Sequence, residues 1–429
     1  MNIVMMTNTY LPIVGGVAHS VATFTEDYRA RGHRVLVVAP QTEGAPPDEQ
    51  DVVRVPAIQH FNGSDFAAPL PAPGRLHEAL DAFRPDLIHA HHPYLLGMTA
   101  LRVARSRDLP LVFTHHTRYE LYTHYVPADS PAFRRFVIEL ATRYANLCDQ
   151  VFAPSESIAE LIRARGVRTP IAVVPTGVDV ARLARGDGAA FRARHGIPPD
   201  AFVVGHLGRL APEKNLAFLA EAVACFLRQA PSAVFLLVGL GPAEDAIRHT
   251  LARAGLLDRL YHAGVLRGRA VADAYHAMDV FAFTSRSETQ GMVLAEAMAA
   301  GVPVVGLDAP GVREVVRDRV NGRLLHEETV NAFCGALHWV ARLPAETRER
   351  LREGARATAR EFSRERSAGR ALACYERLLA GRRRQRPAAE YEQWERLRHL
   401  LRAEWEIVKG LAASAASALV EPAEDDGTR

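Results

Sequence analysis

Apolar residues along this chain follow two alternating patterns. Residues 2–6 and 35–39 are short uninterrupted apolar runs, which are typical of buried strands. Between them, residues 17–30 place Phe24 and Tyr28 on one helical face. A strand, a helix and a second strand in this order predict a β-α-β unit, and such units build a parallel sheet.

The same rhythm restarts in the second half of the chain. Residues 202–206 and 233–238 are apolar runs, and the loop after the first of them, residues 207–215, leads into a helical pattern. Residues 185–199, between the two halves, are rich in glycine and arginine, as is typical of a linker. With 429 residues the chain is long enough for two domains, and we expect each half to form one.

The composition argues against several classes of protein. A formal net charge of +3 is too small to predict nucleic-acid binding, and no apolar run is long enough to cross a membrane. The N-terminus lacks the basic segment of a signal peptide. The four scattered cysteines form no Cys-x-x-Cys motif, so they favour the reducing cytoplasm and disfavour a structural zinc site.

Two glutamates carry the candidate chemistry of the second half. Glu288 follows the apolar run 280–283, and Glu296 lies in the first two turns of a helix that begins near Gly291. Backbone N–H groups at a helix start beside two carboxylates suit a ligand with both phosphate and hydroxyl groups. The alternative is that both glutamates are solvated. However, apolar residues flank Glu296 and predict a buried helix, in which a carboxylate needs a partner.

Other polar residues follow predicted strands, where ligands bind in open α/β sheets. Arg209 and Lys214 suit a diphosphate, although two surface cations have the same pattern, and Gly15 and Gly16 lie at the first strand-to-helix turn. Five histidines end two further strands: His89, His91, His92, His115 and His116. They fall in two separate runs without an acidic ligand at helical spacing, so we expect no metal site there.

The spacing of Glu288 and Glu296, followed by residues 297–305, resembles the signature of the retaining GT-B glycosyltransferases of family 4. Residues 288–291, Glu-Thr-Gln-Gly, are similar to the branch that includes bacterial diacylglycerol glucosyltransferases. The resemblance covers roughly residues 1–380. It implies an α/β fold of the GT-B class, with two doubly wound Rossmann-like domains facing a cleft. Beyond the resemblance, the sequence pattern after residue 381 predicts a C-terminal helical extension.

The resemblance also implies domain boundaries. The expected parts are an N-terminal acceptor-binding Rossmann-like domain (1–185), a C-terminal sugar-nucleotide-binding Rossmann-like domain (195–360), a helix that crosses back to the N-terminal domain (361–381), and an amphipathic helical tail with a disordered end (382–429).

Roles for individual residues follow from the same resemblance. Glu288 is expected to contact the transferred sugar, Glu296 the ribose hydroxyls, and His116 the region near the reacting sugar, with His115 the less favoured histidine. The expected catalytic residues are His116, Glu288, Arg209 and Lys214. The expected donor-binding residues are Gly15, Gly16, Arg209, Lys214, Val265, Glu288, Thr289, Gln290, Gly291, Met292, Val293 and Glu296. The expected acceptor-binding residues are His116, Arg118, Tyr119 and Glu120.

The resemblance implies a retaining hexosyltransferase that moves a hexose from a nucleoside-diphosphate sugar to a diacylglycerol-type lipid. The chain lacks an Asp-x-Asp motif, and cations with a helix start can stabilise the leaving diphosphate, so we expect no metal and no other cofactor. The alternative acceptors are a polysaccharide, a lipid-linked glycan or a small polyol. The alternative classes are a GT-B sugar-nucleotide epimerase and a nicotinamide-dependent oxidoreductase, and the missing G-x-G-x-x-G motif disfavours the latter.

We expect a cytoplasmic protein with peripheral contact to the inner face of the plasma membrane. The nucleotide (UDP or GDP), the hexose and the oligomeric state stay open. The C-terminal tail has an amphipathic pattern of its own after the basic run 382–386. Its apolar stripe consists of Tyr391, Trp394, Leu397, Leu401, Trp405, Val408 and Leu411. Such a helix packs on the body or a second subunit, lies on a membrane, or is partly disordered; our hypothesis is that it increases access to a membrane acceptor.

Overall fold

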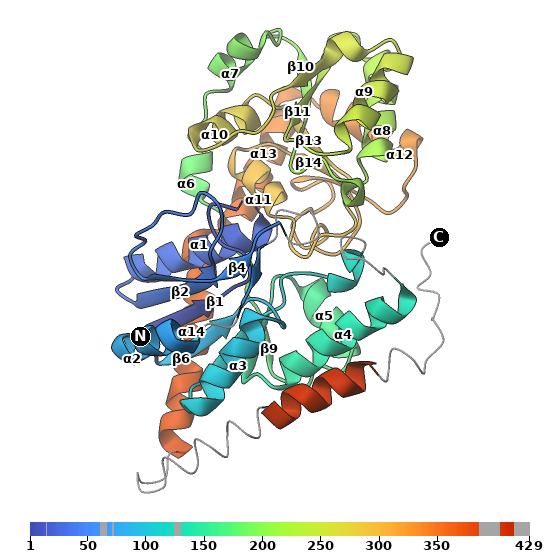
Figure 1. The fold of residues 1–429 in the computed structure, drawn as a ribbon. Helices are drawn as coiled ribbons and strands as arrows, with labels where there is room; N and C mark the ends of the chain where they lie inside the picture. The colour runs from blue at the N-terminus through green and yellow to red at the C-terminus, as the bar shows by residue number, and fades with distance from the viewer. Residues whose placement is uncertain (14, 61–66, 71–72, 124–129, 386–403, 416–429) are drawn as a thin grey trace, which may run out of the picture. The chain divides into compact units, whose positions relative to one another are not determined.

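The computed structural model describes residues 1–13, 15–60, 67–70, 73–123, 130–385 and 404–415 of the chain (Figure 1). The chain divides into two compact units. Unit 1 comprises Met1–Pro175 and Ser367–Arg429, and unit 2 comprises Thr176–Arg366. Unit 1 therefore ends its first segment before the expected residue 185, and the chain returns to it at Ser367 rather than at residue 361.

Unit 1 is built on a seven-stranded sheet in the order β3-β2-β1-β6-β7-β8-β9, and every pairing in it is parallel. Its strands are β1 (Asn2–Met6), β2 (Arg34–Pro40), β3 (Val52–Val55), β6 (Leu87–Ala90), β7 (Leu111–Thr114), β8 (Gln150–Ala153) and β9 (Ile171–Val173). A separate antiparallel pair joins β4 (Ala57–Ile58) and β5 (Ala68–Pro69). The central strands are buried on both faces, which explains why they are uninterrupted apolar runs in the sequence.

Helices cover both faces of this sheet. They are α1 (Gly16–Ala30), α2 (Pro73–Phe83), α3 (Leu96–Ser106), α4 (Pro131–Asn146), α5 (Glu156–Ala164) and α14 (Arg364–Gln385), with a 3₁₀ turn η2 (Tyr119–Leu121) and a further helix at 404–415. On β1, Met5 belongs to the core that includes Tyr28 of α1 and Tyr375 of α14. Its neighbour Met6 points into the core under α2, α3 and α5 on the other face.

Unit 2 is built on a six-stranded parallel sheet in the order β12-β11-β10-β13-β14-β15. Its strands are β10 (Phe202–Leu207), β11 (Ala233–Val238), β12 (Leu260–His262), β13 (Val280–Phe283), β14 (Val304–Leu307) and β15 (Gly322–Leu325). Its helices are α6 (Val180–Leu183), α7 (Gly188–His195), α8 (Leu216–Gln229), α9 (Glu244–Arg253), α10 (Arg269–His276), α11 (Met292–Ala299), α12 (Val330–Ala341) and α13 (Ala345–Glu361), with 3₁₀ turns η4 (Pro212–Lys214) and η5 (Leu257–Arg259). The prediction of two doubly wound α/β units is confirmed.

Strand order locates the ligand-binding edge of each unit. In unit 1 the order runs outward in both directions from β1 and β6, and in unit 2 it does so from β10 and β13. Loops after two such neighbouring strands diverge to opposite faces of the sheet, and ligands bind at the carboxyl ends of the strands at this point. Candidate residues are therefore sought after β1 and β6 in unit 1, and after β10 and β13 in unit 2.

The helix at 404–415 contacts unit 1 through a face that the predicted apolar stripe does not include. Ile407 is buried in the core under α3 and α5, and Glu404 forms an ion pair with Arg102 of α3. Trp405 and Val408 of the stripe are instead 65% and 57% exposed. The stripe residues Tyr391, Trp394, Leu397 and Leu401 lie outside the described residues. Within the described part of the chain, no helix combines the length and the apolar character that a membrane span requires.

Candidate functional site

A Lys–Glu ion pair marks the carboxyl edge of the unit 2 sheet. Lys214 follows β10 and Glu288 follows β13, and Lys214 Nζ lies 2.5 Å from Glu288 Oε1. Two hydrogen bonds connect the loops that carry Lys214 and Glu288. The Thr284 hydroxyl donates to the carbonyl of Lys214, and the Ser287 hydroxyl donates to the carbonyl of Glu213. Both charged side chains are 19% exposed, so the pair is reachable yet largely shielded from bulk water.

Arg209 lies in the same loop but has its own acidic partner. Its guanidinium pairs with Glu213 one helical turn later, and the side chain remains 52% exposed. Close backbone packing shapes this loop, because a Cβ atom on Gly239 would lie 1.9 Å from the carbonyl oxygen of Gly208. Gly239 also has a φ of +127°, which side chains rarely adopt, so glycine is required where the loops after β10 and β11 meet.

The second glutamate lies on α11, as the sequence predicts. Gly291, with a φ of +67°, caps the helix, and α11 begins at Met292. Apart from Glu296 and the half-buried first turn, the helix is buried. The sequence predicts that the Glu296 carboxylate has a partner, and the structure shows that this partner is Tyr275 of α10, whose hydroxyl donates to Oε2 over 2.9 Å.

The remaining expected donor-binding residues of unit 2 have mixed surroundings. Gln290 is buried, and its side-chain amide both accepts from and donates to the backbone of Thr176, over 2.6 Å and 2.7 Å. This pairing gives Gln290 a structural role in holding the loop before α11. Val265 is exposed after β12, and three residues beside Gly291 are half-buried: Thr289, Met292 and Val293.

Unit 1 presents uncharged groups at its corresponding edge. His91 follows β6 and His116 follows β7, and His91 Nδ1 lies 2.9 Å from His116 Nε2. Burial lowers the pKa of both rings well below the usual range, and the neighbouring histidines lower it further. Burial also lowers the pKa of His89 and His92 to about 3. These histidines are neutral near pH 7 and act as hydrogen-bonding groups rather than cations.

Gly15 and Gly16 begin α1 beside this edge of unit 1. Gly15 caps the helix without a side-chain hydrogen bond, and no atom lies within 4 Å of where a Cβ on either glycine would be. The first turn therefore offers backbone N–H groups next to open space, an arrangement that suits an anion.

The expected acceptor residues after β7 form a compact cluster. Glu120 is buried and receives hydrogen bonds from Arg118 over 3.1 Å and from Arg165 over 2.8 Å. Burial would raise the pKa of Glu120, but the hydrogen bond and charge of Arg165, with the charge of Arg118, lower it below the usual range. Tyr119 packs edge-on against the rings of Tyr94 and His115. Glu120 is therefore satisfied within unit 1, whereas Tyr119 forms part of an aromatic wall.

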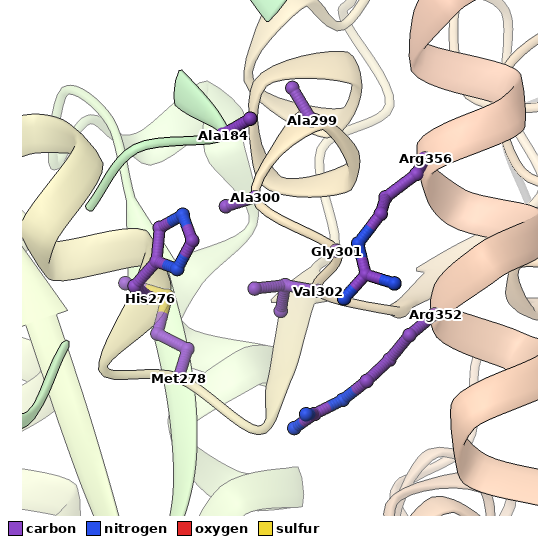
Figure 2. Close-up of a pocket in the computed structure, with 9 residues that line it drawn as sticks. All are labelled: Ala184, His276, Met278, Ala299, Ala300, Gly301, Val302, Arg352 and Arg356. Carbon is purple, nitrogen blue, oxygen red and sulfur yellow. The ribbon is translucent and has the colours of Figure 1, made fainter. Parts of the chain in front are cut away.

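A cavity of about 180 Å³ lies in unit 2 next to the C-terminal end of α11 (Figure 2). Figure 2 shows Arg352 and Arg356 reaching from α13 toward the turn at Gly301. Met278 and Val302, which line it, precede β13 and β14, so the cavity lies at the amino edge of the sheet, away from Lys214 and Glu288. Its arginines pair with Asp279 and Glu349. Among the described residues, no cluster of three or more His, Cys, Asp or Glu side chains is arranged to hold a metal ion.

Three pairings at these edges did not stand out in the sequence. Glu213 is the partner of Arg209, Tyr275 that of Glu296, and His91 that of His116. The i,i+4 spacing of Arg209 and Glu213 is a usable signal. No local pattern reveals the other two, because Tyr275 and His91 meet their partners only after separate strands and helices pack together.

Comparison with known proteins agrees with this architecture. The Glycosyltransferase Family 4 model matches residues 14–182, and the Glycosyl transferases group 1 model matches residues 187–358. A GDP-mannose-dependent alpha-mannosyltransferase of Mycobacterium tuberculosis is 32% identical over 340 residues, which cover 75% of this chain and 83% of that protein. An alpha-monoglucosyldiacylglycerol synthase of Streptococcus pneumoniae is 27% identical over 334 residues, or 76% of each chain.

Solved structures share the fold at lower identity. The Anabaena protein HepE in complex with UDP superposes with a TM-score of 0.69 at 21% identity, over 88% of this chain and 100% of that one. Sucrose-phosphate synthase of Thermosynechococcus elongatus superposes with a TM-score of 0.72, also at 21% identity, over 89% and 100%. The fold and the two strand edges define a GT-B glycosyltransferase. The chain belongs to the family 4, group 1 glycosyltransferases, as its sequence signature indicated.

Proposed function

We propose that this protein is a retaining, metal-independent hexosyltransferase that takes a nucleoside-diphosphate hexose as donor and a diacylglycerol-type lipid as acceptor. The observation that carries the proposal is the pairing of Lys214 with Glu288 where β10 and β13 diverge. A cation and a carboxylate held together at this edge match the two parts of the donor, namely its diphosphate and its sugar hydroxyls. The relative named alpha-monoglucosyldiacylglycerol synthase supports the lipid acceptor. The relative named GDP-mannose-dependent alpha-mannosyltransferase supports a nucleoside-diphosphate sugar as the donor.

We assign the cations of unit 2 to the diphosphate of the donor and its carboxylates to the hydroxyls of the donor. As the bond from sugar C1 to the phosphate oxygen breaks, negative charge grows on the diphosphate, and Lys214 and Arg209 stabilise it. The first turn of α11 adds backbone N–H groups. Glu288 accepts from hydroxyls of the transferred sugar, and the oxygen of Glu296 that Tyr275 does not bind accepts from the ribose.

The proposed stereochemistry needs no general base from the protein. The acceptor hydroxyl attacks C1 on the side from which the diphosphate departs, and its proton passes to the departing phosphate oxygen. One C–O bond breaks, one C–O bond forms, and the proton leaves on the diphosphate. Because attack and departure occur on the same face of C1, the α configuration is kept. The buried histidines of unit 1 carry no charge in this scheme and act by hydrogen bonding.

Three observations support the lipid acceptor and the peripheral membrane location: the lipid named for the pneumococcal relative, the exposed Trp405 and Val408, and the aromatic wall at Tyr119. A second candidate, mannosyl transfer from GDP-mannose, is favoured by the 32% identity to the mycobacterial mannosyltransferase.

One experiment separates these candidates. The full chain is incubated with UDP-glucose, UDP-galactose or GDP-mannose, with and without diacylglycerol vesicles, in the presence of a chelator, and products are identified by mass spectrometry and NMR. The proposal expects one donor to give an α-linked hexosyl lipid, with free nucleoside diphosphate released only when lipid is present. A β-linked product, or activity that needs added Mg²⁺, would contradict the mechanism, and mannosyl product would select the second candidate.

A further inference from the structure

The cavity at the amino edge of the unit 2 sheet is lined on one side by two arginines of α13. Arg352 and Arg356 are one helical turn apart, so their side chains leave α13 on the same face. Figure 2 shows both guanidinium groups on the side of the cavity nearest α13, opposite His276 and Met278. Two like charges at this spacing repel each other, and an anion held by both would offset the repulsion.

Arg352 is poorly paired for a partly buried cation. Within the described part of the chain it makes no hydrogen bond, and its buried Nε has no partner. Its acidic neighbour Asp279 is 3.7 Å away and already accepts from Arg192 over 2.9 Å and from the backbone N–H of Val203 over 2.8 Å. The side chain is 33% exposed, so its terminal nitrogens have donors left for a further acceptor.

Arg356 is packed against the turn that ends α11. A Cβ atom on Gly301 would lie 2.7 Å from its Nε and 2.8 Å from its Nη2, and Gly301 has a φ of +75°. Glycine is therefore required for the guanidinium to approach this turn. Nη1 donates to the half-exposed Glu349 over 2.8 Å, whereas Nε and Nη2 make no hydrogen bond to any described residue.

The charges around the cavity do not cancel. Three guanidinium groups take part in the ion pairs here, those of Arg192, Arg352 and Arg356. They share two carboxylates, on Asp279 and Glu349. One positive charge is left over, and a cavity with a cationic wall attracts a small anion.

The opposite wall limits the ligand. Met278, Ala300 and Val302 line it with apolar groups. His276 adds no N–H donor at Nε2, because that nitrogen is bonded to the carbonyl of Leu183 over 2.9 Å. The volume of about 180 Å³ is below the roughly 300–1,000 Å³ of sites for drug-sized ligands, so it admits a phosphate group but not a nucleoside-diphosphate sugar.

We propose that Arg352 and Arg356 form a binding site for a phosphate group, separate from the donor edge at Lys214 and Glu288. Planar guanidinium groups bind phosphate oxygens through paired, charge-assisted hydrogen bonds. The phosphate is either free in solution or part of a lipid headgroup, and both sources share this chemistry. The site is a property of unit 2 and does not depend on the proposed function.

The first measurement is titration of inorganic phosphate into the full chain, by calorimetry at constant ionic strength so that screening does not change. Arg352→Gln and Arg356→Gln should each raise the Kd about tenfold or more, because each loses hydrogen bonds to a charged acceptor. Arg350→Gln is the matched control, since it removes an exposed cation of the same helix and leaves the same net charge. It should keep the Kd within twofold, and the melting temperature without phosphate verifies that each variant is folded.

A variant of the donor edge separates the two places at which phosphate can bind. Affinity that survives Lys214→Ala and falls in Arg352→Gln supports the proposal. Affinity that falls in Lys214→Ala and is unchanged in Arg352→Gln overturns it, because phosphate then binds at the donor edge. An equal loss in Arg350→Gln also overturns it, as a general effect of charge.

The second measurement identifies the source of the phosphate. Phosphatidylcholine vesicles with and without phosphatidylglycerol are sedimented with the wild type, Arg352→Gln or Arg350→Gln. Phosphatidylglycerol-dependent binding that is weaker in Arg352→Gln than in Arg350→Gln assigns the site to a headgroup, whereas equal vesicle binding with phosphate bound in solution assigns it to the free ion. No dependence on Arg352 with either probe overturns the proposal. A failed proposed function would appear instead as absent turnover with phosphate binding as expected.

Discussion

The two units present opposite chemistry at corresponding edges of similar sheets. At the diverging strands of unit 2, a lysine and a glutamate form an ion pair that is partly open to solvent. At the diverging strands of unit 1, buried histidines are neutral and bond to one another, to Met5, to Thr114 and to Tyr375. The same topology thus serves a charged site in one unit and an uncharged one in the other.

The difference matches what each edge would bind under the proposed function. Charge developing on a leaving diphosphate requires cations that remain charged, and these need partial exposure and a counter-ion. Recognition of hydroxyls requires only neutral donors and acceptors of fixed direction, which burial provides. Fold alone does not distinguish the two units, so their roles must be read from the side chains at the strand ends.

Removing a cation from the charged edge is expected to have the largest effect. Lys214→Ala and Arg209→Ala should each lower kcat by a factor of about ten to a thousand, because each stabilises the leaving diphosphate. Turnover under saturating donor measures this. Arg350→Ala, which removes an exposed cation paired with Glu346 on α13, is the control and should change nothing. Turnover within twofold of the wild type in Lys214→Ala would remove that residue from the mechanism.

Glu296→Ala should weaken donor binding more than it weakens the fold. Each ribose hydroxyl bonded to a charged acceptor contributes about 1.5–3 kcal/mol, so the Kd for nucleoside diphosphate should rise at least tenfold. Isothermal titration calorimetry measures it. Tyr275→Phe, which removes one hydrogen bond to Glu296 and keeps the ring, should have a smaller effect in the same direction. Unchanged affinity in a folded Glu296→Ala protein would exclude the ribose role.

Acid should destabilise unit 1 before unit 2. The folded-state pKa of His89 and of His92 is about 3, below the usual 6.5, so the unfolded chain binds more protons below pH 6.5. Stability present above pH 6.5 is therefore lost as the pH falls toward 3, by on the order of 2 kcal/mol for each of these histidines at pH 5. In unit 2, burial lowers the pKa of His206 to about 4, which gives a contribution of similar size at pH 5 but from one such histidine instead of several.

Hydrogen exchange by mass spectrometry at pH 7.5 and pH 5, corrected for the intrinsic rate, resolves the two units. Peptides of unit 1 are expected to lose protection first. Earlier loss in unit 2 would mean that the histidines of unit 1 are not held neutral by the fold.

Substitutions on the exposed face of the 404–415 helix should have the smallest effect on turnover. Exchanging both Trp405 and Val408 for glutamate is expected to weaken vesicle binding severalfold and to leave donor affinity and melting temperature unchanged, because neither side chain is buried. Deleting everything after Arg382 should weaken vesicle binding to a similar extent. It should also lower the stability of the protein, because Ile407 is part of the core. Unchanged vesicle binding in both variants would dismiss a membrane role for the tail.

The sheets and their edges could be predicted because their signals are local. Buried parallel strands are apolar runs, and residues after them, such as Lys214 and Glu288, lie at ligand-binding edges for topological reasons. The ion pair between these two could not be predicted, because it depends on how the loops after β10 and β13 fold. The orientation of the tail helix could not be predicted either, because its apolar pattern fits packing on the body as well as exposure; within 404–415, Trp405 and Val408 are exposed and Ile407 contacts the core.

The contrast between the two edges is tested most directly by titrating nucleoside diphosphate into two variants, Lys214→Ala and His116→Ala, alongside the wild type. Because the diphosphate is bound by charge, Lys214→Ala should lose about tenfold or more in affinity. His116→Ala should bind the nucleotide as the wild type does, yet lose turnover with the full donor. Wild-type affinity in Lys214→Ala, or lost nucleotide affinity in His116→Ala, would contradict the division between a charged edge and a neutral one.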